Sequence, residues 1–346
     1  MPNLIRHLTS FLCLGAAVPG WIGAVEFSQE QFLVSHSVTG IGSGLQMQSD
    51  APSPLDFVDR PAGTQVQGVA SVEASTQPLF DGLSQATLGA AHYRFDSRTL
   101  ILAMAGIVGT DGIAVRPLLT GTREARLNQP DLRPGDCADC TVLSDQVYLG
   151  AINAQRSFQG FLPRSGLASQ PIPFAFIAGL TTKYFWEELE GDDYLAQALN
   201  LDAGLQLEIG LDYDPVSNQS QRDLIFEFSG FELLPTSQRS EIDGFVKEER
   251  GENRWHLGLS WREAWPSLAS GTRLGITQKS EGGKWPGIAV EGNFKRCLFL
   301  RTGYDGSTWA SGMTLNWRMI GVHYAMQKHP LGMTWYQLAL QAAWPP

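Results

Sequence analysis

The last sixteen residues, 331–346, read LGMTWYQLALQAAWPP, and every second residue from Tyr336 to Trp344 is apolar or aromatic. Glutamine and alanine occupy the positions between them. A period of two predicts a β-strand with one apolar face, because successive side chains of a strand point to opposite sides. Either a second sheet or lipid could cover that face, so two classes of all-β protein stay open.

The same alternation runs through the second half of the chain and, more weakly, through the first. Upstream we expect strands near 64–75, 85–96, 98–109, 145–158, 174–187, 199–213 and 222–232. Seven more between 253 and 344 bring the total to about fourteen, each of roughly ten residues, which is the length that a tilted strand needs to cross a bilayer.

The connections between these segments alternate in length. Residues 95–98, 293–297 and 318–321 form tight connections, whereas 110–144 and 233–252 are long and polar or charged. Short turns at one end and long loops at the other are typical of outer-membrane barrels. The long connection expected at 159–173 departs from this rule, because it belongs to the end with the short turns.

Aromatic residues favour lipid over a second sheet. Eight of the ten tryptophans follow residue 254. Tyr336 and Trp344 share a face and lie about 26 Å apart along a strand, or about 20 Å vertically after tilting, which approaches the ~25 Å apolar band of such barrels. We predict an all-β transmembrane antiparallel β-barrel in the outer membrane, with an aromatic girdle; a soluble periplasmic β-protein is the minor alternative. The expected girdle residues are Trp255, Trp261, Tyr336 and Trp344.

The N-terminus predicts export. Arg6 and His7 precede an apolar stretch that ends near Ala24, as in a cleaved signal peptide. No later apolar run approaches the ~18 residues of a membrane-spanning helix. We therefore divide the chain into a signal peptide, an N-terminal plug or periplasmic segment, and the barrel, at 1–24, 25–63 and 64–346.

Charge and cysteines narrow the function further. The formal charge of −10 argues against a nucleic-acid partner, because no basic stripe can follow the phosphates. Cys137 and Cys140 form a CxxC in a polar loop, for which we predict a disulfide in preference to a redox or metal site. Because no second CxxC or histidine pair completes a zinc site, no metal is expected.

Several short pieces resemble the FadL-like outer-membrane barrels, particularly the PorV/PorQ branch. Residues 42–63 fit the N-terminal segment of that branch through Asp50-Ala51 and Pro61-Ala62-Gly63, although Arg60 stands where the branch has asparagine. The middle and the end of the chain resemble the branch through Lys183, Tyr184, Asp202, Gly204, Leu300, Arg301, Gly303, Tyr304, Tyr324, Leu331, Gly332 and Thr334.

This resemblance implies a plug and a non-enzymatic role. The plug residues would be Asp50, Arg60, Pro61, Ala62 and Gly63, before or within the lumen. FadL-like proteins imply passage or binding of a hydrophobic small molecule across the outer membrane, whereas the PorV branch implies a surface scaffold that docks exported proteins. Neither implies a cofactor.

Catalysis is not expected from the residues either. His256 and Ser260, on one face of a strand, would be roughly 13 Å apart, too far for a hydrogen bond. Charged residues on the non-lipid face could form a ligand or gating site, or could simply pair across a polar lumen, and we favour the second reading. These lumen-facing candidates are Arg273, Glu291, Lys295, Arg301, Arg318 and His323.

Overall fold

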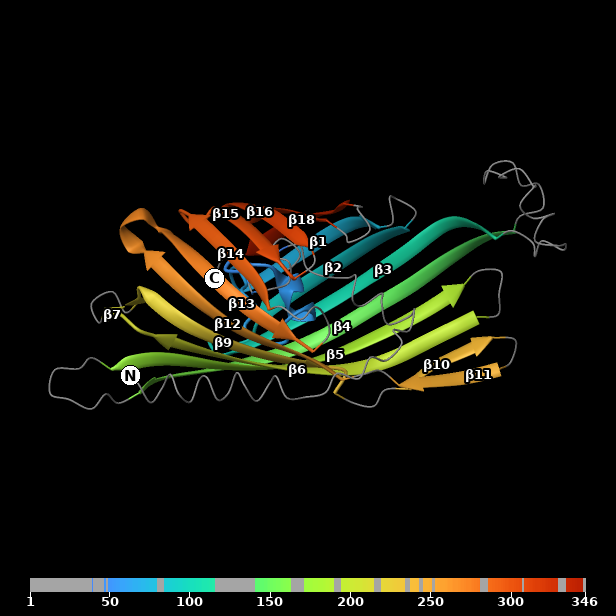
Figure 1. Cartoon of the computed structure of the whole chain (residues 1–346), viewed down its shortest axis with the longest axis horizontal. Coiled ribbons are helices and arrows are strands. Elements are labelled where there is room, and N and C mark those ends of the chain that lie inside the picture. Colours follow the sequence, from blue (N-terminus) through green and yellow to red (C-terminus); the bar gives the residue numbers. More distant parts are fainter. Residues whose placement is uncertain are drawn as a thin grey trace.

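The computed structural model shows an all-β chain (Figure 1). It describes residues 39, 47, 49–79, 84–115, 141–162, 171–189, 194–214, 219–233, 237–242, 245–250, 253–280, 286–306, 308–328 and 334–344. Among these residues, no helix has the length and apolar character needed to cross a membrane. Two short 3-10 helices, η1 (Pro54–Val58) and η4 (Pro266–Leu268), accompany the strands.

Most of the strands follow one another in chain order around a ring. Their bounds are β1 (Ala70–Leu79), β2 (Ser84–Arg94), β3 (Thr99–Val115), β4 (Thr141–Leu162), β5 (Ile172–Leu189), β6 (Tyr194–Gly210), β7 (Tyr213–Asp214), β8 (Gln219–Ser220), β9 (Arg222–Phe231), β10 (Ser237–Ile242), β11 (Phe245–Arg250), β12 (Arg254–Trp265), β13 (Ser270–Lys279), β14 (Gly287–Phe294), β15 (Leu298–Tyr304), β16 (Trp309–Trp317), β17 (Ile320–Lys328) and β18 (Thr334–Trp344).

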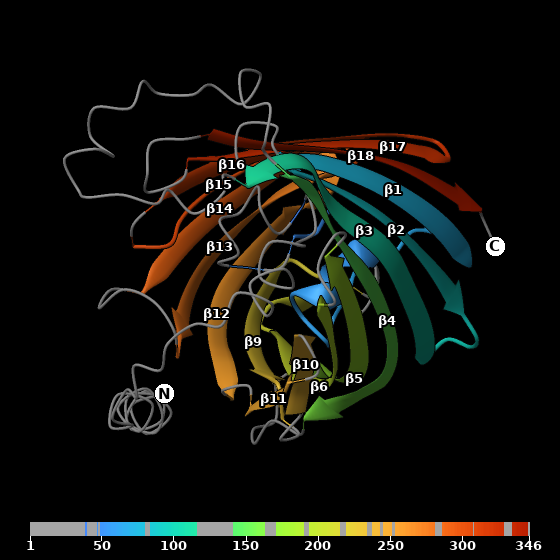
Figure 2. The same cartoon turned by 90° about the vertical axis from the view of Figure 1, so that its right-hand side faces the viewer.

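Fourteen of these strands close an antiparallel barrel, as the sequence predicts (Figure 2). The first strand pairs with the last, with Ala70 opposite Trp344, and β6 pairs with β9 to complete the ring. The hairpin β10–β11 adds to β6 beyond the point where β9 leaves it, and β7–β8 form a small separate ribbon. Closure leaves no free edge in the ring, which removes the usual hazard of exposed strand edges.

The C-terminal strand β18 has one buried face and one exposed face. In β18 the side chains of Gln337 and Gln341 are buried inside the barrel, whereas Leu338 and Leu340 are 45% and 57% exposed. The apolar face therefore points outward and is not covered by a second sheet. The same alternation recurs along β13 to β17.

The two ends of the barrel differ. The end that carries the start of β1 and the end of β18 also carries the tight turns at 95–98, 266–269, 295–297 and 318–319, and we name it the turn end. The opposite end is the loop end. The long connection expected at 110–144 is partly strand, because β3 continues to Val115 and β4 begins at Thr141, with a register shift after Thr110.

The first strand begins later in the chain than predicted. We expected it at 64–75, but β1 begins at Ala70. Gly63 and Gly68 have positive φ angles of 80° and 76°, so the backbone changes direction there instead of continuing as a strand. Thr64 instead donates its backbone N–H to the side chain of Gln155 on β4, inside the ring.

Part of the interior is occupied by residues 49–67, which precede β1 and which we name the inner segment. Its helix η1 lies within the ring, as Figure 2 shows in blue. Leu55, Phe57 and Val58 pack on an apolar stretch of the inner wall, which we name the apolar wall. It consists of Ala86, Leu88, Ala90, Leu100, Leu102, Met104, Val108, Val147, Leu149, Ala151, Phe185 and Ala198, from β2 to β6.

Two wall glycines allow the inner segment to approach closely. A Cβ at Gly179 on β5 would overlap the carbonyl of Pro61, and one at Gly204 on β6 would lie 2.7 Å from the backbone N of Ala62. Pro61 and Ala62 thus rest directly on the backbone of the wall. Both glycines are required by the space available and not by an unusual φ.

This contact predicts that Gly179→Ala displaces the inner segment. Because backbone would have to move, we expect a loss of about 1–3 kcal/mol in stability and faster proteolysis within the inner segment. Gly150→Ala on β4 is the control, since no atom lies within 4 Å of its added Cβ. The measurement is the temperature of the heat-dependent gel shift; equal shifts for both variants would contradict the contact.

Candidate functional site: the ion-paired inner segment and the cavity beneath it

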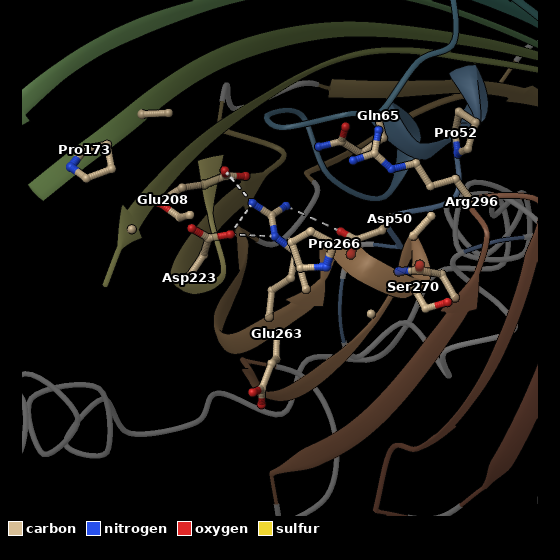
Figure 3. Close-up of a pocket in the computed structure, with 18 of the residues that line it drawn as sticks. Asp50, Pro52, Gln65, Pro173, Glu208, Asp223, Glu263, Pro266, Ser270 and Arg296 are labelled. Carbon is tan, nitrogen blue, oxygen red and sulfur yellow. Dashed lines mark hydrogen bonds and ion pairs between the residues drawn. The ribbon is translucent and has the colours of Figure 1, made fainter. Parts of the chain in front are cut away.

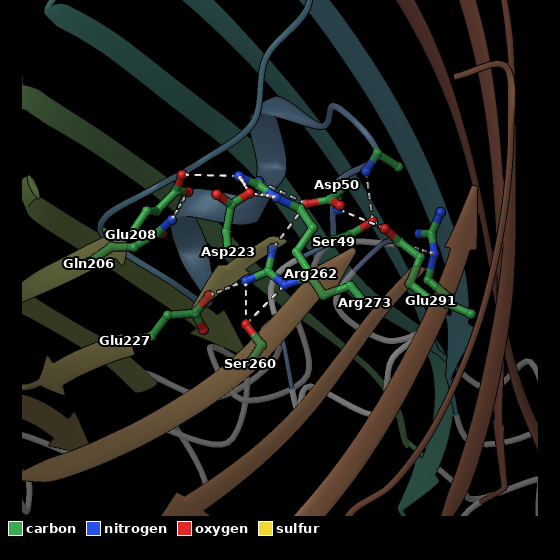
Figure 4. A network of polar contacts seen from close by, with 12 residues as sticks. Ser49, Asp50, Gln206, Glu208, Asp223, Glu227, Ser260, Arg262, Arg273 and Glu291 are labelled. Atoms are coloured by element: carbon green, nitrogen blue, oxygen red, sulfur yellow. Dashed lines mark hydrogen bonds and ion pairs between the residues drawn. The ribbon is translucent and has the colours of Figure 1, made fainter. Parts of the chain in front are cut away.

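Two residues of the inner segment are held by one ion pair of the wall. Arg273 on β13 places Nη2 2.7 Å from Glu227 Oε1 on β9 and Nη1 3.1 Å from Asp50 Oδ1. Arg60 pairs with the other carboxylate oxygen of Glu227. Figure 4 shows most of this arrangement, which we name the clasp (Asp50, Arg60, Glu227 and Arg273).

The side chains of the clasp are largely buried. The Arg273 side chain is 1% exposed, and that of Glu227 is 8% exposed. Ser260 on β12 accepts hydrogen bonds from Nε and Nη2 of Arg273 at 3.1 and 3.0 Å. Each buried charge therefore has an opposite charge and further hydrogen bonds, which is the condition for a buried pair to be tolerated.

A second arginine extends the network toward the turn end. Arg262 on β12 lies 2.7 Å from Asp223, 3.2 Å from Glu208 and 3.7 Å from Asp50 (Figure 4). Its side chain is 25% exposed and is therefore more accessible to solvent than that of Arg273. Asp50 thus bridges the two arginines and ties the inner segment to both.

On the other side of Asp50 the network reaches β14 to β18. Glu291 accepts the backbone N–H of Asp50 at 2.8 Å and the hydroxyl of Ser49, and pairs with Arg301 Nε at 3.4 Å. Arg301 donates to Thr314, whose hydroxyl lies 3.0 Å from His323 Nδ1. The polar half of the interior is therefore one connected network.

The wall also binds the backbone of the inner segment. Asn153 donates to the carbonyl of Pro61 at 2.9 Å, and Lys183 donates to the carbonyl of Val58 at 2.9 Å while pairing with Asp202 at 2.7 Å. These contacts satisfy carbonyls that would otherwise be buried without partners. They hold the segment by its main chain, whatever its side chains are.

The structure separates the six charged candidates into two groups. Arg273, Glu291, Arg301 and His323 are buried inside the barrel, and all four belong to the network just described. Lys295 and Arg318 were expected in the lumen, but they lie in two tight turns and are exposed. Strand alternation does not continue through a turn, so it misplaced them.

Several network residues were not among the candidates. Glu227 and Asp223 occupy alternate positions of β9, between Leu224, Phe226 and Phe228. Arg262 follows Trp261 in the same way on β12. The signal was therefore present as charges in alternation with apolar residues, but only the tertiary fold shows that these strands are neighbours.

The remaining site predictions concern aromatics and cysteines. Trp261, Tyr336 and Trp344 are 36%, 46% and 48% exposed, and Trp255 is partly buried. Their role as a girdle stays a prediction. Cys137 and Cys140 lie outside the described residues, whereas Cys297 is a free thiol at the β14–β15 turn.

A cavity of about 1230 Å³ lies beneath the inner segment at the turn end (Figure 3). One side is charged and includes Glu208, Asp223 and Arg262. Its larger apolar lining residues are Pro52, Val66, Phe161, Pro173, Phe174, Pro266 and Phe299. Its size suits a drug-sized molecule, and its mixed lining suits an amphipathic one.

Reactive groups are not assembled in the described residues. None of their His, Cys, Asp and Glu side chains gather in threes that could hold a metal ion. Ser71 Oγ lies 2.7 Å from His92 Nδ1, but His92 Nε2 has no hydrogen-bond partner that could orient the ring as in a catalytic triad.

Comparison with known proteins adds structural neighbours. No protein family matches the sequence, and no curated protein matches it either. The chain is similar to the toluene transporter TbuX of Ralstonia pickettii at 9% identity, covering 90% of this chain and 99% of that one, with a TM-score of 0.44. It is similar to the toluene transporter TodX of Pseudomonas putida at 10% identity, covering 89% and 96%, with a TM-score of 0.41.

A third neighbour is the translocator domain of the autotransporter NalP from Neisseria meningitidis, at 9% identity, covering 80% and 88%, with a TM-score of 0.28. TbuX and TodX belong to the FadL family. The assignment of a closed barrel to this chain rests on its own strand pairing and not on these overlays.

The clasp predicts that Glu227→Gln strongly destabilises the inner segment. The substitution leaves Arg60 and Arg273 buried without their common carboxylate, for which we expect a loss of about 3–5 kcal/mol. Asp212→Asn is the matched control, because its 3.0 Å ion pair with Arg222 is half exposed and is expected to contribute less than about 1 kcal/mol. Thermal unfolding in detergent measures both, and similar losses would refute the clasp.

Proposed function

We propose that the chain is an outer-membrane β-barrel and not an enzyme, and that it binds or passes hydrophobic small molecules. The membrane placement is supported by the outer face, where Leu338, Leu340, Ile152 and Leu180 are each at least 45% exposed. A soluble protein rarely exposes a contiguous apolar surface on this scale. With the tight turns at one end, this surface fits a barrel whose termini lie in the periplasm.

One observation carries the proposed ligand class. The apolar wall faces inward, where a water-filled pore would carry polar side chains. Leu102 is fully buried and Leu88 is 2% exposed, because Leu55, Phe57 and Val58 of the inner segment cover this region. A surface that accepts leucine and phenylalanine side chains would accept an apolar ligand of similar size.

The mechanism follows from the packing of η1 on the apolar wall, because each buries the apolar surface of the other. A hydrophobic molecule that enters from the loop end would take the place of η1 on the apolar wall. Displacement of η1 would pull on Asp50 and Arg60, which flank it and are both held in the clasp. The ligand would then leave through the barrel wall or through the cavity into the periplasm.

A second candidate is a surface scaffold for exported proteins, as the PorV branch would imply. The observation in its favour is the filled interior, since a scaffold needs no passage. The strands β4 and β5, of 22 and 18 residues, also exceed the ~9–11 residues that a bilayer requires, so part of this wall would stand outside the membrane.

Membrane insertion predicts a depth-dependent cost of charge on the outer face. Leu338→Arg lies near the middle of β18 and should destabilise the barrel by about 2–4 kcal/mol in a bilayer, whereas Thr334→Arg, on the same face at the strand end, should lose about 0–1 kcal/mol. Denaturant unfolding from lipid vesicles measures the difference. Folding in buffer without detergent or lipid would end the membrane assignment.

Ligand binding predicts a dependence on the apolar wall. We expect Leu102→Gln and Met104→Trp, the first by polarity and the second by volume, to weaken binding of N-phenyl-1-naphthylamine about tenfold, since a lost apolar contact contributes roughly 1–3 kcal/mol. Ser75→Ala, on the polar half of the interior, is the control. Fluorescence titration in detergent measures binding, and the heat-dependent gel shift checks folding.

Mass spectrometry of the natively extracted protein separates the two functions. A near-stoichiometric apolar molecule supports passage or binding and excludes a pure scaffold. A co-purifying exported protein with no apolar molecule, together with unchanged probe binding in both wall variants, overturns the proposed ligand class.

A further inference from the structure

Three cations at the turn end occupy backbone positions that favour glycine or asparagine. Lys295 and Arg296, in the turn between β14 and β15, have φ angles of 52° and 53°, and Arg318, between β16 and β17, has φ of 56°. The first turn is closed by a hydrogen bond of 3.1 Å from Cys297 N–H to the carbonyl of Phe294. Asn-Gly is the favoured pair where both central residues are left-handed.

The choice of lysine and arginine therefore runs against local backbone preference. Left-handed residues with long side chains are uncommon, and strained positions cluster where a side chain has a task. Three of the five non-glycine residues with positive φ in the described chain are these cations.

Two of the three cations lie beside exposed aromatic rings, and the third, Arg296, follows Lys295 in its turn and lines the cavity at the turn end. Lys295 Nζ lies 5.3 Å from the ring centroid of Phe294, and Arg318 Cζ lies 5.6 Å from that of Trp317. The two turns touch, because Asn316 donates its backbone N–H to the carbonyl of Cys297 at 2.7 Å. We name Phe294, Lys295, Arg296, Trp317 and Arg318 the basic aromatic cluster.

The cluster is accessible and unneutralised. Trp317 is 70% exposed and Phe294 is 52% exposed, and the three cations are exposed as well. In the described part of the chain, none of the three forms an ion pair with a carboxylate. The chain carries a formal charge of −10, so a bare positive patch stands out against its overall charge.

Its position marks a boundary between apolar and polar surroundings. Met319 and Ile320, the next residues of the second turn, are 44% and 53% exposed and continue into the apolar outer face of β17. Aromatic rings with cations beside them suit the level of lipid headgroups, because the ring faces the acyl region and the charge faces water.

A third turn at the same end, between β2 and β3, shows a similar pattern. Arg98 and Arg156 are exposed beside Phe95, which is 71% exposed, and Arg156 Cζ lies 5.9 Å from the Phe158 ring centroid. The carboxylate of Asp96, in the same turn, offsets part of this positive charge. The backbone N–H groups of Arg98 and Thr99 bind it at 2.6 Å each, and chiefly the bond from Arg98 lowers the pKa of Asp96.

We propose that the basic aromatic cluster binds the phosphate of an anionic phospholipid in the leaflet at the turn end. Three neighbouring cations match a headgroup with net negative charge better than a zwitterionic one, and arginine pairs with phosphate oxygens through two N–H groups. The proposal rests on the membrane placement proposed above and adds a lipid specificity to it.

The test exploits the backbone strain. In the triple variant Lys295→Asn, Arg296→Gly and Arg318→Gly, each turn receives a residue that it favours, so the barrel should fold and melt at the same or a higher temperature. Native mass spectrometry of protein in micelles containing equal phosphatidylglycerol and phosphatidylcholine counts the retained lipids. The control is Lys328→Gln, an exposed cation at the loop end.

We expect the wild-type protein and Lys328→Gln to retain phosphatidylglycerol over phosphatidylcholine by about tenfold or more. The triple variant should lose most of this preference, because each lysine or arginine near an anionic surface contributes about a fivefold effect. An unchanged preference in the triple variant, or an equal loss in Lys328→Gln, overturns the proposal.

The result is independent of membrane insertion. Because the competition is run in micelles, a lost preference is measured even if Leu338→Arg and Thr334→Arg unfold alike in vesicles. Equal unfolding of Leu338→Arg and Thr334→Arg in vesicles overturns the membrane placement. A wild-type protein that inserts into vesicles but binds both lipids equally overturns only the lipid specificity. Displacement by inorganic phosphate at millimolar concentration would identify a free anion site and also overturn the lipid assignment.

Discussion

The ion pair between Glu227 and Arg273 is the contact on which the interior depends. It joins β9 to β13 across β12, and each partner also holds one residue of the inner segment, Arg60 for Glu227 and Asp50 for Arg273. A barrel of this width has room inside, and something must neutralise the charges that line it. Here the chain supplies its own counter-charges, so the wall and the inner segment stabilise one another.

The interior is divided into two unlike halves. From β2 to β6 the wall carries the apolar stretch that packs on η1, whereas from β9 to β18 it carries the connected polar network. A water-filled pore would need polar walls all round, and a plain hydrophobic core would not carry buried arginines. The combination allows one face of the inner segment to be exchanged for an apolar ligand while the other face stays anchored.

The sequence predicted the barrel well because alternation is a local property. Polar and apolar residues alternate within each strand, so β18 could be oriented from residues 336–344 alone, and the strand count followed from repetition. The lengths of β3 and β4 were underestimated, because their ends carry less alternation than their middles. Lys295 and Arg318 were misplaced because a turn interrupts the period of two.

The clasp could not be predicted in this way. Glu227 and Arg273 are 46 residues apart, and Asp50 and Arg273 are 223 residues apart. Which inward charges meet depends on ring closure and on the shear of the strands, neither of which a single sequence reveals. The contact of Pro61 with Gly179 is likewise a property of the closed ring. The sequence contains the glycine but does not indicate which segment packs against it.

The place of the inner segment in the chain has a consequence for the order of assembly. The segment precedes β1, and β1 closes the ring against β18, which is synthesised after the other strands of the ring. The ring can therefore close only after β18 is available, and the inner segment is synthesised long before that seam forms. Pairings between such distant parts of a chain make folding slow. A chain truncated before β18 would thus lack more than one strand: it would have no seam to shut the inner segment in.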